Sequence, residues 1–278
     1  MSANSVFGKI YYFFIGIIMS ICLTLDIPMR AIGKPLDLTG YQMVWSDEFE
    51  GTELDTTKWQ GHVVPLGSGP VAYDGGYLDD SAVAVKDGNL ILSIKQYPES
   101  AGDRAGEYYF FYLDSRPGFS GTYGYYECRA KLAKARAGNC AFWMNSPTAY
   151  DYDVPKEEGV EIDIMESMQY GRKYQGSIER NIHYFDSTGH QHLRARFFKV
   201  GGDPYEEFNT YGLKWDENGY TFYVNGKECR NTDFGVSKAP EYIVLSNFMR
   251  DFTKKEIVGD SADFIVDYVR VYQQSPAG

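Results

Sequence analysis

The sequence contains little cysteine, and this shortage excludes a disulfide scaffold. One of its four cysteines lies in an apolar run near the N-terminus, so Cys128, Cys140 and Cys229 can form at most one pair among themselves. We expect buried free thiols, because an unpaired cysteine behaves as a small apolar side chain. A bond between Cys128 and Cys140 across a hairpin is the alternative. The spacing of the three matches no metal-binding motif.

Basic residues are also few, since 27 Lys and Arg stand against 38 Asp and Glu, which gives a net charge of −11. No basic cluster offsets this charge, so a phosphate backbone would be repelled and no nucleic-acid partner is expected. The acidic balance also fits a neutral rather than a polyanionic ligand. Aromatic residues, by contrast, make up 16% of the chain. This exceeds what a core usually requires and leaves rings available to line a surface groove.

Long apolar stretches are missing except at residues 10–25, which follow Lys9. This run has the length of the apolar part of a secretory signal and is slightly short for a membrane-spanning helix. We expect residues 1–34 to be an export signal. A membrane anchor is the alternative, because no small-x-small cleavage site follows. Either interpretation predicts a secreted or cell-envelope protein, tethered through residues 10–25 if the segment is retained.

The rest of the chain has the pattern of an all-β protein. Short runs rich in β-branched and aromatic residues alternate with turn residues, and none is long with helical spacing. The predicted strands include 82–85, 90–94, 123–129, 220–224 and 265–272. The pair Asn225-Gly226 indicates a type I′ hairpin within a meander over 215–230. Because no linker or repeat follows residue 35, we predict one monomeric sandwich or jelly-roll domain of two antiparallel sheets over 35–278.

The most informative segment is 159–167, Gly-Val-Glu-Ile-Asp-Ile-Met-Glu-Ser. Acidic residues are depleted in β-strands. If 159–167 is a strand, alternation puts Glu161 and Asp163 on the same face. A β-bulge at 164–165 would bring Glu166 to that face as well. Three carboxyls on one face raise at least one pKa. A protonated acid then lies beside an ionised carboxylate, as glycoside cleavage requires. An acidic patch on an edge strand and a divalent-metal site remain the alternatives.

The run Glu-Ile-Asp-Ile-Met-Glu resembles the active-site motif of glycoside hydrolase family 16, the group of laminarinases, lichenases, agarases and carrageenases. Other segments agree in order and spacing over nearly all of 41–272: 44–49, 54–59, 121–129, 141–144, 181–183, 208–215 and 267–272. The resemblance implies a concanavalin-like β-jelly roll with a substrate groove on its concave face. It also implies that Glu161 is the nucleophile, Asp163 the assisting acid and Glu166 the acid/base. The extra residue before Glu166 is similar to the bulged branch of the family.

The resemblance also suggests residues that bind substrate. Trp143 aligns with the family's stacking tryptophan, and His183 matches a position that lines the site. Laminarinases commonly carry a tryptophan shortly before the acidic motif, where this chain offers Tyr150 or Tyr152 instead. Tyr77 and Arg116 are further candidates for the groove.

The activity implied is endo-acting, retaining hydrolysis of a polysaccharide without a cofactor for catalysis, with a β-1,3- or β-1,3/1,4-glucan as the expected substrate. The alternatives are a galactose-based glycan, such as agar, carrageenan, galactan or a mucin-type chain, and a non-catalytic carbohydrate-binding jelly roll. A sulfated glycan would require cations such as Arg172 and Arg194 in the groove. Family members often hold a structural Ca²⁺ on the convex side, for which Asp267 resembles the ligand. His190 and His192 are expected in a solvated loop rather than at a metal.

Overall fold

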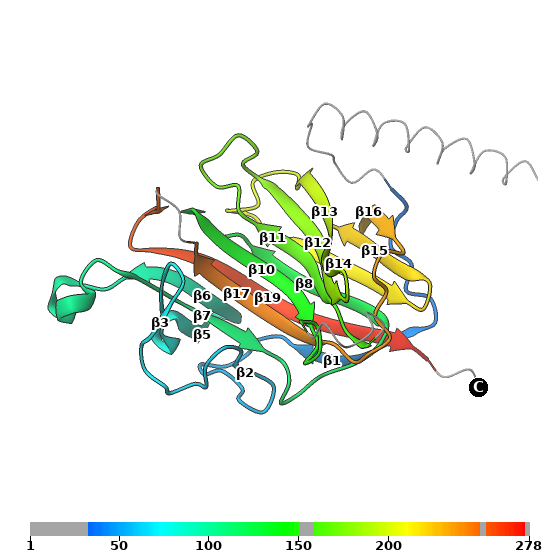
Figure 1. The fold of residues 1–278 in the computed structure, drawn as a ribbon, viewed down its shortest axis with the longest axis horizontal. Helices are drawn as coiled ribbons and strands as arrows, with labels where there is room; N and C mark the ends of the chain where they lie inside the picture. Colours follow the sequence, from blue (N-terminus) through cyan, green and yellow to red (C-terminus); the bar gives the residue numbers. More distant parts are fainter. Residues whose placement is uncertain (1–32, 151–157, 251–253, 276–278) are drawn as a thin grey trace, which may run out of the picture.

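The computed structural model describes residues 33–150, 158–250 and 254–275. Over these ranges the chain forms a jelly roll of two antiparallel sheets that enclose one core (Figure 1). β7 (Tyr108–Asp114) belongs to both sheets, because its first residues pair with β6 and its last residues with β17. The predicted two-sheet jelly roll is therefore confirmed.

One layer, here called the groove sheet, carries the acidic segment. Its strands lie in the order β7, β17 (Tyr242–Met249), β10 (Gly138–Asn145), β11 (Glu161–Ser167), β12 (Ser177–Asp186) and β13 (Gly189–Lys199), and β2 (Gln60–Gly61) lies on the other side of β7. β11 is thus flanked by strands on both sides. The alternative of an edge strand is wrong.

The other layer, the outer sheet, is centred on the long C-terminal strand. Its order is β5 (Val83–Lys86), β6 (Asn89–Gln96), β19 (Ser261–Gln274), β8 (Gly124–Lys131), β14 (Asn209–Asp216), β15 (Gly219–Val224) and β16 (Lys227–Thr232), with β1 (Tyr41–Asp47) along the second half of β19. The remaining elements are short: β3 (Val71–Tyr73), β4 (Gly76–Leu78), β9 (Ala135–Arg136), β18 (Glu256–Ile257), and the 3₁₀ turns η1 (Asp80–Ala82) and η2 (Glu99–Arg104).

Strand alternation decides which side chains enter the core between the layers. In β10, Cys140, Phe142 and Met144 are buried in the core, whereas Trp143 lies on the opposite face, as alternation predicts. The groove sheet therefore buries one face and leaves the other available for polar side chains.

The strands predicted from sequence correspond to β5, β6, β8, β15 and β19, and the predicted meander is β14–β15–β16. Asn225 and Gly226 have φ angles of 50° and 67°, the two positive values that a type I′ turn requires. All three cysteines of the described residues are free and buried, so the expected free thiols are confirmed.

No helix of the described ranges is long and apolar enough to cross a membrane. The apolar run 10–25 lies outside those ranges, so the signal or anchor over 1–34 stays a prediction.

A buried acid just before β17 makes stability depend on pH. Glu241 is fully buried, and burial raises its pKa to about 8, although hydrogen bonds from Ser237 and the Val160 N–H act in the opposite direction. Because the folded protein binds this proton more tightly than the unfolded chain, the stabilisation is complete below pH 4.5 and is lost as the pH rises through about 8. Each unit of difference between the folded and unfolded pKa values changes the free energy of unfolding by about 1.4 kcal/mol.

We therefore expect Glu241→Gln to gain thermal stability relative to wild type between about pH 5 and about pH 8.5. The measurement is the difference in Tm between the two proteins at both pH values. Glu217→Gln, which changes an exposed acid, is the matched control and should show a difference that does not vary with pH. The same pH trend in both variants would contradict the prediction.

Candidate active site

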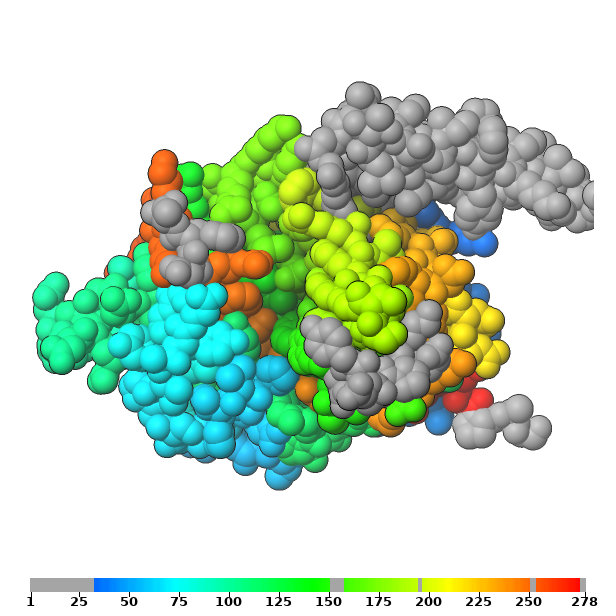
Figure 2. All heavy atoms as spheres, viewed as in Figure 1, coloured from blue at the N-terminus to red at the C-terminus, as the bar shows by residue number. Residues whose placement is uncertain are grey.

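A groove of about 560 Å³ lies on the polar face of the groove sheet. Alternate residues of β10, β11, β12 and β13 form its floor, and residues of β7 and β17 extend it to one side. Figure 2 shows this face hollowed at its centre, beside the yellow-green hairpin that β12 and β13 form. An open groove across several strands suits an elongated ligand.

A β-bulge in β11 brings all three acids to this groove. The register of β11 against both neighbouring strands shifts between Asp163 and Glu166. The extra residue lets Ile164 and Met165 both enter the core, and Glu166 returns to the face of Glu161 and Asp163. The bulge predicted at 164–165 is therefore confirmed.

Two asparagines hold the carboxyl group of Glu166. Asn139 on β10 donates from Nδ2 to Glu166 Oε1 at 2.8 Å, and Asn181 on β12 donates from Nδ2 to Oε2. Each carboxyl oxygen thus has an amide donor from a different neighbouring strand. This arrangement fixes the direction in which Glu166 faces the groove.

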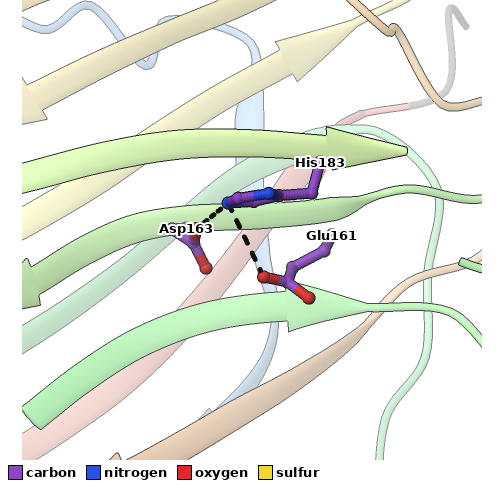
Figure 3. Close-up of side chains that lie close together, drawn as sticks. All are labelled: Glu161, Asp163 and His183. Atoms are coloured by element: carbon purple, nitrogen blue, oxygen red, sulfur yellow. Dashed lines mark ion pairs between the residues drawn. The ribbon is translucent and has the colours of Figure 1, made fainter. Parts of the chain in front are cut away.

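Glu161 and Asp163 meet the imidazole of His183, which extends from β12 (Figure 3). His183 Nε2 lies 3.3 Å from Asp163 Oδ2 and 3.9 Å from Glu161 Oε1. The Tyr150 hydroxyl donates a hydrogen bond to Glu161 Oε2. One atom each of Glu161, Asp163 and His183 lie within 4.8 Å of one another, so these three could also ligate a divalent cation.

The three carboxyls share one buried site and cannot all ionise together. Burial, together with the charge of Glu166, raises the pKa of Glu161 to about 7, although the hydrogen bond from Tyr150 lowers it. Burial, and then the charges of Glu166 and Glu161, raise the pKa of Asp163 well above its ordinary value. The pKa of Glu166 is also raised by burial, against the opposing hydrogen bonds of Asn139 and Asn181. Near neutral pH the site therefore holds protonated and ionised carboxyls side by side.

His183 belongs to a stack of three histidines. Its ring centroid lies 4.0 Å from that of His192, and its Nδ1 lies 2.9 Å from His190 Nε2. Burial, and then the neighbouring rings of His192 and His190, lower the pKa of His183 to about 3, so the imidazole is neutral. The expectation of a solvated loop at 190–192 is wrong. Both histidines lie in β13, paired across the hairpin with β12, and the spacing of two between them was the missed strand signal.

The predicted substrate-binding residues do not all lie in the groove. Trp143 lines the groove and donates from Nε1 to Ser246 Oγ at 3.1 Å. Tyr77 lies on β4, outside the residues that line this groove, and its ring packs against Tyr97. Tyr152 falls in 151–157, outside the described residues.

Arg116 lies beyond Trp143 rather than in the groove. It pairs with the buried Asp114, with Nη2 at 2.6 Å from Oδ2, and its guanidinium covers the ring of Tyr242. His62 also binds Asp114 and lies edge-on to Trp143, with centroids 5.4 Å apart. Arg116 is thus linked to Trp143 through Asp114 and His62.

The residue expected to bind calcium lies on β19 of the outer sheet. Asp267 Oδ2 accepts from Arg129 Nη1 at 2.5 Å. This ion pair uses one oxygen of the carboxylate, and the structural Ca²⁺ at Asp267 stays a prediction.

Sequence reasoning missed several polar residues of the groove floor, among them Asn139, Glu179 and Asn181. They come from strands beside β11. Polar residues at every second position of 179–183 were the signal that could have found part of this set.

Comparisons with known proteins agree with this geometry. The family model described as β-porphyranase A–D, GH16 domain, matches residues 41–274. Glucan endo-1,3-β-glucosidase A1 of Niallia circulans is 28% identical over 88% of this chain, and keratan-sulfate endo-1,4-β-galactosidase of Sphingobacterium multivorum is 28% identical over 84%. The chain spans only 40% and 56% of these two relatives.

Among solved structures, a non-specific endo-β-1,3(4)-glucanase from family GH16 is similar to this protein, with a TM-score of 0.67 and 24% identity. The match covers 89% of this chain and 97% of that structure. It supports the fold assignment.

Proposed function

Because this chain belongs to glycoside hydrolase family 16, we propose that it cleaves internal β-glycosidic bonds of a polysaccharide with retention of configuration. The observation that carries the proposal is the bulge in β11, which gathers Glu161, Asp163 and Glu166 in one groove. Two carboxyls with different protonation states are what a double displacement at the anomeric carbon requires.

In the first step, the Glu161 carboxylate attacks the anomeric carbon while Glu166 gives its proton to the leaving glycosidic oxygen. The C–O bond breaks and a glycosyl ester of Glu161 forms. The hydrogen bond from Tyr150 and the nearby His183 orient Glu161 for this attack. In the second step, the Glu166 carboxylate removes a proton from water, whose oxygen displaces Glu161 and restores both residues.

Asp163 is neither the nucleophile nor the acid/base. Its pKa is raised well above the ordinary value, so Asp163 competes with Glu161 for a proton. Asp163 therefore assists catalysis by keeping Glu161 ionised, and this chemistry needs no metal ion or other cofactor.

For the substrate, we favour an anionic galactose-based glycan over the neutral glucan expected from sequence. Arg172, Arg194 and Arg250 line the groove. Arg250 contacts the sulfur of Met168, which follows the end of β11 that carries Glu166. Guanidinium groups bind sulfate-like anions through charge-assisted hydrogen bonds. The names of the porphyranase-type family model and of the keratan-sulfate relative point to the same class.

A digestion panel tests both parts of the proposal. Wild-type and Glu161→Gln proteins are incubated with keratan sulfate, porphyran, laminarin and mixed-linkage β-glucan, and products are read by mass. Oligosaccharides from a galactose-based polymer with the wild type alone are expected. Cleavage restricted to laminarin or mixed-linkage glucan would instead support a glucanase, which the similarity to the Niallia enzyme also suggests. No products, with equal glycan binding by both proteins, would support a binding module.

The arginines provide a more specific prediction. Arg172→Gln and Arg250→Gln are each expected to lower kcat/KM on keratan sulfate by about tenfold, because a charged hydrogen bond to an anion is lost. On chemically desulfated keratan the loss should be much smaller. Arg129→Gln on the outer sheet is the matched control and should leave both rates unchanged. Equal losses on the two polymers would rule out recognition of the sulfate.

The cellular location is part of the proposal. The apolar run 10–25 supports export, because a polysaccharide too large to cross a membrane is met outside the cell. Retention of this run would tether the enzyme to the cell envelope.

A further inference from the structure

A fourth acid, Glu179, lies on the floor of the groove beside the acid/base. It is on β12 with 1% of its surface exposed and is directly opposite Glu166 of β11 in the strand register. Opposed residues of neighbouring antiparallel strands place their Cβ atoms about 5 Å apart. Like charges at such positions are destabilising, so the pair requires an explanation beyond folding.

Glu179 is bound by two further groove residues. Arg194 of β13 donates to Glu179 Oε2 from Nε at 2.9 Å and from Nη2 at 2.8 Å. Gln169, in the segment after β11, donates to Oε1 at 3.3 Å. The guanidinium and the amide fix the carboxyl group of Glu179 beside Glu166.

The direct partners of Glu166 act against its role as an acid. Asn139 and Asn181 each donate to one of its oxygens, which favours the ionised form. The positive charge of Arg250 also lowers the pKa of Glu166. A general acid must nevertheless carry its proton when substrate binds.

The groups that favour the proton come from β11 and β12. Burial is the largest effect on the pKa of Glu166, and the charge of Glu179 raises that pKa further. Glu161 and Asp163 face Glu166 from its own strand, while β13 contributes Arg194 and His192 to the same groove and the segment after β11 contributes Arg172. Of these four acids, Glu179 alone has no role in the proposed reaction steps, and it is fixed by an ion pair with Arg194.

We propose that Glu179, held by Arg194 and Gln169, is a positioning residue that keeps the proton on Glu166 until the glycosidic bond is cleaved. This inference rests on the proposed function, in which Glu166 is the acid. In this role Glu179, with 1% of its surface exposed, acts through Glu166. Arg194, whose side chain is 55% exposed, stabilises the buried carboxylate of Glu179.

Two variants of Glu179 separate charge from shape. Glu179→Gln keeps the shape and removes the charge, so the alkaline limb of the kcat/KM profile should move down by about one pH unit. Glu179→Asp keeps the charge, so its limb should lie close to that of wild type even if the overall rate is lower. A uniform loss without movement of the limb in both variants, or no change in either, would overturn the proposal.

A third variant keeps the test decisive if Glu179→Gln does not fold. Arg194→Met changes a half-exposed side chain and removes the guanidinium that stabilises the buried carboxylate of Glu179, so the charge beside Glu166 should be reduced and the alkaline limb should move to lower pH, as in Glu179→Gln. Arg194→Lys keeps a positive charge beside Glu179 and should leave the limb close to that of wild type. An unmoved limb in Arg194→Met would contradict the proposal.

A measurement without substrate distinguishes this inference from the proposed function. In protein labelled with ¹³C at the glutamate carboxyl carbon, the Glu166 signal is identified by its loss in Glu166→Gln, and its titration is followed in wild type and Glu179→Gln. A lower midpoint in the variant is expected, and equal midpoints would refute the role of Glu179. Failure of the wild type to cleave any polymer would count against the proposed function alone.

Discussion

Glu161→Gln is expected to lower kcat on the cleaved polysaccharide by about 10⁴-fold or more, because an amide of the same shape cannot form the glycosyl ester. The loss should appear in kcat, with KM little changed, since the side chain fills the same space. Initial rates measured by reducing ends test this, together with binding of the intact glycan. A residual kcat within tenfold of wild type would exclude Glu161 as the nucleophile.

Stability and chemical rescue serve as the controls for Glu161. Burial raises the pKa of Glu161 to about 7, so its ionisation destabilises the folded protein above that pH, and Glu161→Gln should have a Tm at about pH 8 no lower than wild type. Loss of folding would then not explain the loss of activity.

Glu161→Gly should regain turnover with azide, and the glycosyl azide formed should have the anomeric configuration opposite to that of the substrate. A product of the same configuration would contradict retention through Glu161.

Glu166→Ala is expected to lose about 10³-fold or more on the natural polymer, because no group then gives a proton to the leaving oxygen. The effect should depend on the leaving group. An oligosaccharide linked to dinitrophenol, whose departure needs no proton, should form the glycosyl enzyme at nearly the wild-type rate, visible as a burst of released phenol.

The pH profile gives a second readout for Glu166. The wild-type kcat/KM profile should fall on its acid side as Glu161 takes up a proton, with a midpoint set by a pKa of about 7, and on its alkaline side as Glu166 loses one. In Glu166→Ala the alkaline fall should disappear and the acid fall should remain. Asn139→Ala is a graded comparison, because it removes one donor to Glu166 and leaves the carboxyl group in place. A leaving-group dependence equal to that of wild type would exclude Glu166 as the acid.

The substrate residues show where sequence reasoning reached its limit. Trp143 was placed on the correct face because alternation within one strand is a local property. Arg116 and Tyr77 were candidates by residue type, yet Arg116 is held by Asp114 and Tyr77 packs against Tyr97. Such partners come from distant parts of the chain. The sequence around Arg116 and Tyr77 does not specify which residues will contact them.

The acidic segment 159–167 also shows which features follow from local sequence and which depend on tertiary contacts. Its alternation and the one residue out of step predicted the bulge and the common face of Glu161, Asp163 and Glu166. These follow from the geometry of a single strand. The chain by itself also determined the jelly-roll class, because periodicity and turn residues act over short distances.

Only the tertiary structure decided what surrounds those acids. The amides of Asn139 and Asn181, the stack on His183, and the pair of Glu179 with Arg194 each join residues of different strands. Strand order and register bring them together, and both are set by packing of the whole sandwich rather than by any local run. Protonation in the groove depends on this register, since burial and neighbouring charge are properties of the assembled sheet.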